Sequence, residues 1–190
     1  ELMYGLLLSG LAMQMTGHSR PASGAEHHMA HFWEMAVINE EIDAYHGEKV
    51  GVGLIQVSDI YHEAVKYLKE GNFKIKDHVD VETDLIEKIF TNKELCESIK
   101  KTNDPNLLDL IDPKVLKEKT DEIIKIIEEI PKAEEIVAML EKVHGVKSLE
   151  DLGFAPDMKE RTARVAPYIR DRITFLRILK FYDFYDEVIK

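Results

Sequence analysis

The stretch HGEKVGVGLIQVSDIYHEAVKYLKEG, residues 46–71, predicts a long helix. Gly71 is a typical C-terminal stop, because glycine readily adopts the left-handed conformation found there. Three further glycines near the start of the stretch, Gly47, Gly51 and Gly53, weaken the helix intrinsically. We interpret them as places where another backbone or a ligand comes close, since glycine has no side chain to obstruct the approach.

Helical patterns continue on both sides of this stretch. Residues 2–15 and a segment from Ser23 to about Asn39 predict two helices before it. After it, amphipathic segments predict helices at residues 81–90, 93–101, 114–130, 131–143, 157–165 and 169–190. We find no alternation typical of strands, no alternating strand–helix units and no internal repeat. The sequence therefore predicts an all-α fold, a helical bundle of about seven to nine helices in a single domain covering residues 1–190.

The composition is that of an ordinary globular protein, with 32% charged and 45% hydrophobic residues. A chain of 190 residues is long enough to bury its own core. Its 36 acidic and 25 basic residues give a formal charge of −11, which argues against binding to nucleic acid or anionic membranes because phosphate would be repelled. Cys96 is the only cysteine, so no internal disulfide can form, and we expect a reduced, cytoplasmic location.

The N-terminal run ELMYGLLLSGLAMQM, residues 1–15, is apolar from its second residue onward. A signal peptide would begin with basic residues, whereas this run begins with Glu1. A membrane span needs about 20 apolar residues, and this run stops near Thr16. We therefore expect a helix buried on most sides and no membrane insertion. The run has no helix cap and no initiator methionine, so we expect the sequence to open inside a helix and part of a larger protein to be missing.

Histidines are concentrated in TGHSRPASGAEHHMAHFWEM, residues 16–35, which holds four of the chain's eight. His27 and His31 are four residues apart and share one face of the predicted helix. His28 and His31, three apart, could also share a face, but His28 points about 100° away from His27. His46 follows at the start of the long helix. Such histidines are often solvated surface residues, so on spacing alone a metal site and an ordinary polar helix both remain open.

The start of the same helix has the features of an anion site. The residues SGAE, 23–26, have the form of a capping box, in which Ser23 caps the helix and Glu26 reaches back. Free N–H groups and the helix dipole place positive potential there, and Arg20 adds a guanidinium group. The segment SRPASG, residues 19–24, could therefore hold a phosphate beside a metal ion.

Two blocks, GHSRPASGAEHHMAHFWEM (17–35) and YHGEKVGVG (45–53), closely resemble the sn-glycerol-1-phosphate dehydrogenase family. That family lies within the superfamily of iron-containing alcohol dehydrogenases, glycerol dehydrogenase and dehydroquinate synthase. The segment APYIRDRITFLRIL (166–179) looks like the family's late helical segment. The resemblance covers essentially the whole chain, but only the C-terminal, helical half of the family's proteins. It implies a two-domain enzyme whose N-terminal α/β domain binds NAD(H) or NADP(H), with a catalytic metal between the domains.

The resemblance also implies roles for single residues. His27 and His46 match the family's metal ligands, namely the first histidine of an H-x-x-x-H pair and the histidine of an HG pair. His31 then matches a catalytic residue near the substrate, and His28 lies outside the ligand set. Neutral imidazole suits zinc, which we expect here, with nickel or iron as alternatives.

The resemblance implies parts that these 190 residues lack. The family's third protein ligand, an aspartate, and its glycine-rich nucleotide loop have no counterpart in the sequence. We therefore interpret the chain as a helical metal- and substrate-binding domain without its nucleotide-binding domain, and we expect it to be inactive alone.

The activity that the resemblance implies is the reversible NAD(P)H-linked reduction of dihydroxyacetone phosphate to sn-glycerol 1-phosphate. The metal would polarise the substrate carbonyl, and His31 would hydrogen-bond the substrate or relay a proton. Ser19, Arg20 and Ser23 are the candidates for binding the phosphate, or nearby hydroxyls, of this small phosphorylated three-carbon substrate. The alternative for these three residues is a purely structural loop.

Three other interpretations of the chain remain. A dehydroquinate synthase would carry a segment like NxGHTxGH, which is absent, and a glycerol dehydrogenase would have no need of Arg20. The third is a freestanding, non-catalytic helical module with a vestigial metal site. If the chain is half of an enzyme, it should expose apolar surface that its partner domain normally covers, and a homodimer could form through that surface.

Overall fold

The computed structural model describes residues 2–35, 43–155 and 157–190. Its α-helices are α1 (Leu2–Thr16), α2 (Ala25–Glu34), α3 (His46–Glu70), α4 (Thr83–Ile89), α5 (Lys93–Thr102), α6 (Pro113–Glu118), α7 (Thr120–Glu128), α8 (Ala133–Glu141), α9 (Met158–Val165), α10 (Phe175–Ile178) and α11 (Tyr185–Val188). Short 3-10 helices are η1 (Arg20–Ala22), η2 (Leu107–Leu110), η3 (Ala166–Tyr168) and η4 (Leu179–Phe181).

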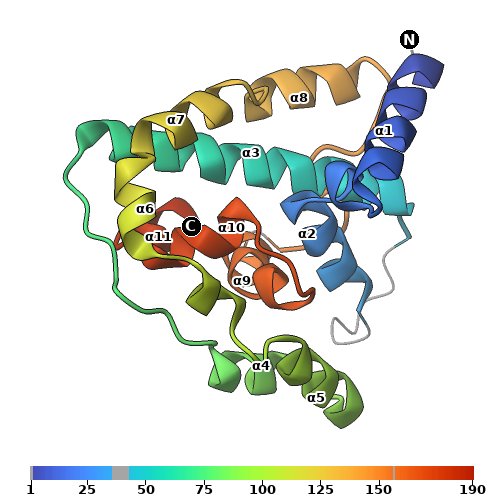
Figure 1. Ribbon diagram of the computed structural model, residues 1–190. Coiled ribbons are helices and arrows are strands. Elements are labelled where there is room, and N and C mark those ends of the chain that lie inside the picture. The colour runs from blue at the N-terminus through green and yellow to red at the C-terminus, as the bar shows by residue number, and fades with distance from the viewer. Residues whose placement is uncertain (1, 36–42, 156) are drawn as a thin grey trace.

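The long helix α3 is the axis around which the other helices are arranged (Figure 1). Helices α7 and α8 run along one side of α3, and α9 to α11 lie on the other side. Helix α2 packs against α3, α9 and η3, while α4 and α5 pack against each other at the edge of the molecule. The core between these layers contains Phe32, Ile60 and Leu176, which have no exposed surface.

The predicted all-α fold is confirmed. No strand is formed in the described ranges, where an isolated bridge pairs Ile75 with Tyr182. The long helix predicted from residues 46–71 is also confirmed, because α3 ends where Gly71 adopts the left-handed conformation with a φ of 71°.

The helices are shorter and more numerous than the seven to nine predicted, since the described residues form eleven α-helices. One example is the segment 114–130, which is divided between α6 and α7. Just after the division, the Thr120 hydroxyl donates back to the carbonyl oxygens of Leu116 at 3.1 Å and Lys117 at 3.0 Å. Such bonds compete with the regular helical ladder and favour a change of direction.

The C-terminal segment was predicted to be one helix from residue 169 to the end, and this prediction is wrong. The chain instead forms the short elements α10, η4 and α11. Tyr182 between them is extended, and the neighbouring backbone pairs with residues 74–76, for example through Lys76 N–H to the Phe181 carbonyl at 2.8 Å. The physical reason is burial: apolar side chains from nearly every position here are inside, which one straight helix at the surface could not achieve.

Helix α2 is shorter than predicted. It begins at Ala25 instead of Ser23, and Glu34 is its last residue. Met35 is extended, with a φ of −72° and a ψ of 138°, so α2 ends before it. The predicted end at Asn39 lies outside the described residues.

Only half of the predicted capping box forms at the start of α2. Glu26 does reach back, and its Oε1 accepts a hydrogen bond from Gly24 N–H at 2.8 Å. Ser23 is extended instead of capping the helix, with a φ of −154° and a ψ of 93°. Its Oγ accepts a hydrogen bond from Arg172 Nη1 at 3.3 Å, so a distant arginine takes the place of the helix N–H group.

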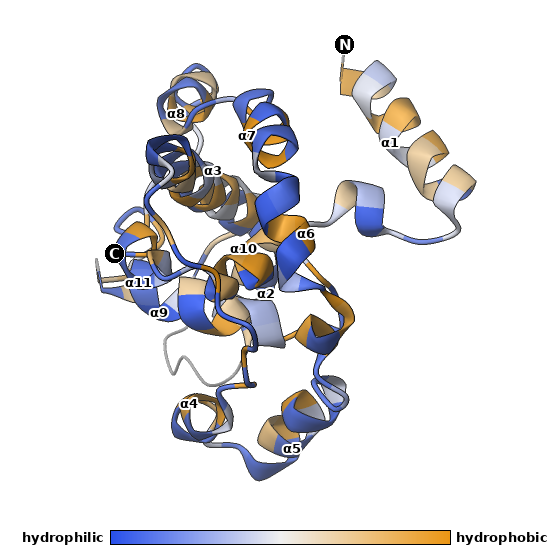
Figure 2. Cartoon of the chain, turned by 60° about the vertical axis from the view of Figure 1, so that its left-hand side comes forward, coloured by the Kyte–Doolittle hydropathy of each residue, from blue (hydrophilic) through white to orange (hydrophobic). Residues whose placement is uncertain are grey.

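Helix α1 forms as predicted, but the burial expected for it is wrong. None of its residues is buried, and the side chains of Leu7 and Met15 are largely exposed. It contacts mainly η1 and stands away from the other helices (Figure 2). Its apolar surface is where we would expect two copies to meet, although a homodimer stays a prediction. Within the described ranges, no helix combines the length and the hydrophobicity of a membrane span.

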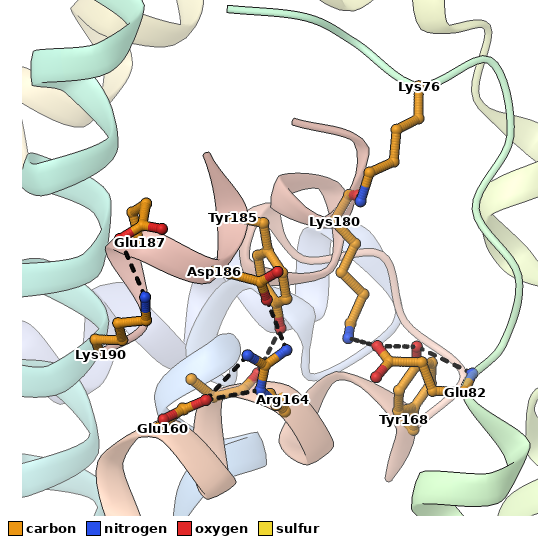
Figure 3. A network of polar contacts seen from close by, with 11 residues as sticks. Lys76, Glu82, Glu160, Arg164, Tyr168, Lys180, Tyr185, Asp186, Glu187 and Lys190 are labelled. Atoms are coloured by element: carbon orange, nitrogen blue, oxygen red, sulfur yellow. Dashed lines mark hydrogen bonds and ion pairs between the residues drawn. The ribbon is translucent and has the colours of Figure 1, made fainter. Parts of the chain in front are cut away.

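A buried polar network joins α4 to the C-terminal segment (Figure 3). The Lys180 ammonium, with 2% of its side chain exposed, pairs with the Glu82 carboxylate. It lies 4.7 Å from the ring centre of Tyr168 and 4.8 Å from that of Tyr185, and the Tyr168 hydroxyl donates to Glu82 at 3.2 Å. Burial lowers the pKa of Lys180 to about 8, although Glu82 acts in the opposite direction.

Candidate metal and phosphate site

Three imidazole rings meet where α2 lies against the beginning of α3. The ring centres are 6.2 Å apart for His27 and His31, 5.6 Å for His27 and His46, and 5.3 Å for His31 and His46. The helices can approach closely because Gly53 faces α2: a Cβ atom there would lie 2.7 Å from the Glu26 carbonyl oxygen. The predicted close approach at this glycine is therefore confirmed.

Each of the three rings has a carboxylate at its Nδ1 atom. Glu26 Oε1 lies 2.8 Å from Nδ1 of His27. Glu34 serves two rings, with Oε1 at 2.9 Å from Nδ1 of His46 and Oε2 at 3.3 Å from Nδ1 of His31. Histidines that bind metals commonly donate one ring N–H to a carboxylate, which leaves the other nitrogen as the ligand. The arrangement of these rings therefore suits metal ligation through Nε2.

The surroundings favour an ionised Glu34 carboxylate and a neutral His31 ring. Burial opposes ionisation of Glu34, but hydrogen bonds from His46 and from Lys49 outweigh it and lower the pKa of that carboxyl. Burial also lowers the pKa of His31, and the nearby Arg170 contributes, although Glu34 opposes both. A neutral imidazole is the form that binds a metal ion, so the shift at His31 keeps that ring available at neutral pH.

Among the residues that the structure describes, His31, Glu34 and His46 form a compact group of possible metal-binding atoms. One side-chain atom of each lies within 4.8 Å of the others. The His27 ring, expected to be a ligand with His46, stands beside this group at the distances given above. The structure thus brings His27, His31 and His46 together, and it adds Glu34, which the sequence did not single out.

His28 occupies a different environment from its three neighbours in sequence. Its side chain is buried, and within the described part of the chain neither ring nitrogen has a hydrogen-bond partner. Burial lowers its pKa to about 4, and the positive charge of Arg172 acts in the same direction. The expectation that this ring stays apart from the ligands agrees with its position.

The residues expected to bind phosphate are brought together by Arg172. Its Nη2 donates to Ser19 Oγ at 3.0 Å, and its Nη1 donates to the Ser23 carbonyl at 3.0 Å. Arg20 lies between these two serines in η1. A second guanidinium, from a segment far along the chain, therefore stands at the place where the sequence predicted an anion site.

A cavity of about 630 Å³ opens beside this group. Arg20, Arg172 and Ser23 line one part of it, whereas the rest has apolar walls such as Leu54 and Phe175. Glu26 also lines the cavity and is hydrogen-bonded to His27, so a single carboxylate connects the cavity with the imidazole cluster.

Sequence reasoning missed three residues of this region, Glu34, Lys49 and Arg172. A local signal existed for Glu34, which follows His31 by three positions and so shares its helix face. Lys49 and Arg172 gave no such signal, because their contacts join segments that are 15 and 149 residues apart in sequence.

Proteins similar in sequence to this chain were found among the glycerol-1-phosphate dehydrogenases. The chain is 32% identical over 179 residues to a protein named glycerol-1-phosphate dehydrogenase (NAD(P)+) from Halalkalibacterium halodurans, covering 94% of this chain and 37% of that protein. A protein of the same name from Geobacillus stearothermophilus is 33% identical over 180 residues, with the same coverage. One from Methanocorpusculum labreanum is 50% identical over 58 residues, which is 30% of this chain and 15% of that protein. No family model and no solved structure matches.

These matches confirm the resemblance seen in the sequence. Almost the whole of this chain aligns with the two bacterial relatives, but the aligned part is only 37% of each relative's length. This is consistent with the C-terminal domain expected. The chain is therefore a homologue of the glycerol-1-phosphate dehydrogenases, alignable with one part of them.

Proposed function

We propose that this chain is the helical C-terminal domain of a metal-dependent, NAD(P)-linked glycerol-1-phosphate dehydrogenase that reduces dihydroxyacetone phosphate to sn-glycerol 1-phosphate. The observation that carries the proposal is the cluster of three imidazole rings, 5.3 to 6.2 Å apart, with their Nδ1 atoms turned to carboxylates. The name of these relatives supports NAD(P)+ as the cofactor and a phosphorylated glycerol as substrate or product.

His27 and His46 would hold a divalent metal, zinc by preference, together with a donor from outside these 190 residues. Once bound, such an ion acts as a Lewis acid on the C2 carbonyl of the substrate. Nicotinamide held by a second domain would supply the hydride. The chain alone is proposed to be inactive, because it would carry neither the complete ligand set nor the nucleotide site.

The residues of this chain would orient the substrate and move a proton. His31 stands beside both ligand rings and would hydrogen-bond the substrate or relay a proton. Arg20 and Arg172, with Ser19 and Ser23, would bind the phosphate, since guanidinium groups match phosphate geometry and charge.

The metal assignment is tested on the protein that carries this domain. Metal content and NAD(P)H-dependent reduction of dihydroxyacetone phosphate are measured for His27→Ala, His46→Ala and, as a control, His78→Ala, whose ring is exposed and far from the cluster in sequence. We expect the first two variants to lose the metal and at least about 100-fold in kcat/KM, because each would remove a ligand. Normal activity in either variant would contradict the assignment.

The phosphate assignment is tested by comparing two substrates. Arg172→Ala should lower kcat/KM for dihydroxyacetone phosphate by about 10- to 100-fold, the effect of losing a hydrogen bond to a charged group. Reduction of glyceraldehyde, which has no phosphate, should change little. Arg161→Ala, an exposed arginine on α9, serves as the control. An equal loss with both substrates would show that Arg172 supports the loop and does not bind phosphate.

A further inference from the structure

The Glu34 side chain contacts two of the three rings in the imidazole cluster, and these two rings belong to different helices. It belongs to the last turn of α2, yet it contacts His46 at the first position of α3. We propose that Glu34 is a positioning residue, which holds the His31 and His46 rings in the Nδ1–H form, so that Nε2 of the ligand His46 is turned toward the metal ion and Nε2 of His31 toward the substrate beside it. This inference rests on the proposed function, since it concerns how the same metal site is organised.

The hydrogen bonds of the carboxylate carry the argument. Oε1 accepts from His46 Nδ1 at 2.9 Å and from Lys49 Nζ at 3.2 Å, and Oε2 lies 3.3 Å from His31 Nδ1. A carboxylate accepts several hydrogen bonds but donates none when ionised, so both rings must present N–H groups to it. Each ring then carries its lone pair on Nε2, and for His46 this is the tautomer that metal ligation requires.

Lys49 fixes the carboxylate itself. The Lys49 side chain is 11% exposed, and it reaches Glu34 from the first turn of α3. The contact gives Glu34 an ammonium neighbour besides the two rings. Two groups from α3 thus hold one carboxylate from α2, which ties the position of His46 to that of His31 across the helix boundary.

The Glu34 carboxylate could instead be a metal ligand, because it belongs to the compact group of donor atoms. The contacts argue against this second role. Both of its oxygens are engaged by ring N–H groups or by Lys49, and ligation would break at least one of these bonds. It would also bring the metal against the lysine ammonium. The two roles predict different states of the rings once metal is bound.

The first test uses the protein without metal. Nitrogen NMR of the imidazole rings, at about pH 8 where free imidazole is neutral, reports which ring nitrogen carries the proton. We expect Nδ1–H for His31 and His46 in the wild type and a shift toward Nε2–H in Glu34→Ala. Glu34→Gln keeps the size of the side chain but has one acceptor oxygen, so an intermediate shift is expected. Glu63→Ala, a change on the exposed face of α3, is the control.

The second test measures the affinity for zinc alone, by competition with a coloured chelator. Glu34→Ala should bind zinc about 10- to 100-fold more weakly than wild type, the usual effect of removing a carboxylate that orients a histidine ligand. Glu63→Ala should bind as wild type does. In zinc-bound wild type, both Nδ1–H signals should persist.

The outcomes separate this inference from the proposed function. Unchanged tautomers and unchanged zinc affinity in Glu34→Ala would overturn it, and so would loss of the Nδ1–H signals on zinc binding, which would make Glu34 a ligand. If the wild type binds no zinc but Glu34→Ala still shifts the tautomers, the metal-dependent function fails while the positioning of the two rings is upheld.

Discussion

The imidazole cluster and the Lys180 network are both groups of polar side chains between helices. They differ in how far their polar atoms are enclosed and hydrogen-bonded by neighbouring side chains. The Lys180 ammonium is 2% exposed, pairs with Glu82 and lies between two tyrosine rings. In the imidazole cluster, the His46 side chain is 48% exposed. Within the described residues, hydrogen bonds reach only the Nδ1 atoms of the three rings.

The difference indicates different roles. A buried charge enclosed by its partners can stabilise the fold but offers no atom to a ligand. A ring fixed through one nitrogen and open at the other is prepared for an additional partner. Changes in the first region should therefore alter stability without altering metal binding, and changes in the second should do the reverse.

The largest expected effect on stability comes from breaking the lysine network. Glu82→Ala leaves Lys180 buried without its carboxylate, and we expect the free energy of unfolding to fall by about 2 kcal/mol. This is below the usual value for a buried pair because the Glu82 side chain is 39% exposed and the lysine can release its proton. Urea unfolding measures the change. Lys180→Met, of similar size but apolar, should lie within about 1 kcal/mol of wild type.

An effect of Glu82→Ala on metal binding would remove the distinction between the two regions. If Glu82→Ala weakened zinc binding as strongly as a histidine replacement, the lysine network would belong to the metal site, and the contrast between the regions would fail.

A smaller effect is expected where α2 meets α3. Gly53→Ala places a Cβ atom 2.7 Å from the Glu26 carbonyl oxygen, so α2 must move. We expect a loss of about 1–2 kcal/mol in stability from overpacking, together with weaker zinc binding, because the ring positions depend on this contact. At Gly47 a Cβ atom meets nothing within 4 Å, so Gly47→Ala should leave both properties almost unchanged. Equal effects of the two alanines would refute the role of the close contact.

The smallest effect is the pH dependence of stability from Lys180. Its folded pKa of about 8 lies below its ordinary value of 10.5, so between these values the unfolded chain binds a proton that the folded chain does not. Stability should therefore rise with pH, by about 1 kcal/mol from pH 8.5 to pH 9.5 relative to Lys180→Met. Above about pH 10 the stability of both proteins should fall, because burial raises the pKa of Tyr168 and of Tyr185. Parallel pH profiles of wild type and Lys180→Met would contradict this.

Local patterns predicted the parts of the fold that depend on neighbouring residues. The all-α class, the extent of α3 and its end at Gly71 followed from periodicity and from glycine stereochemistry. The C-terminal segment could not be predicted in this way. Its path depends on pairing with residues 74–76 and on burial of side chains on all sides, which are properties of the packed molecule.

The same distinction applies to the candidate site, where local sequence predicted some features and the packing of distant segments determined others. Sequence alone determined that His27 and His31 share a helix face, because helical spacing is local, and it placed the GHSRPASGAEHH block in a known family. The resemblance to the family implied that His46 joins His27. Only the tertiary structure decided that the Glu34 carboxylate contacts rings on two helices and that Arg172 meets Ser19 across 153 residues. Contacts between distant segments depend on how whole helices pack, and the spacing of residues along the chain carries no record of that geometry.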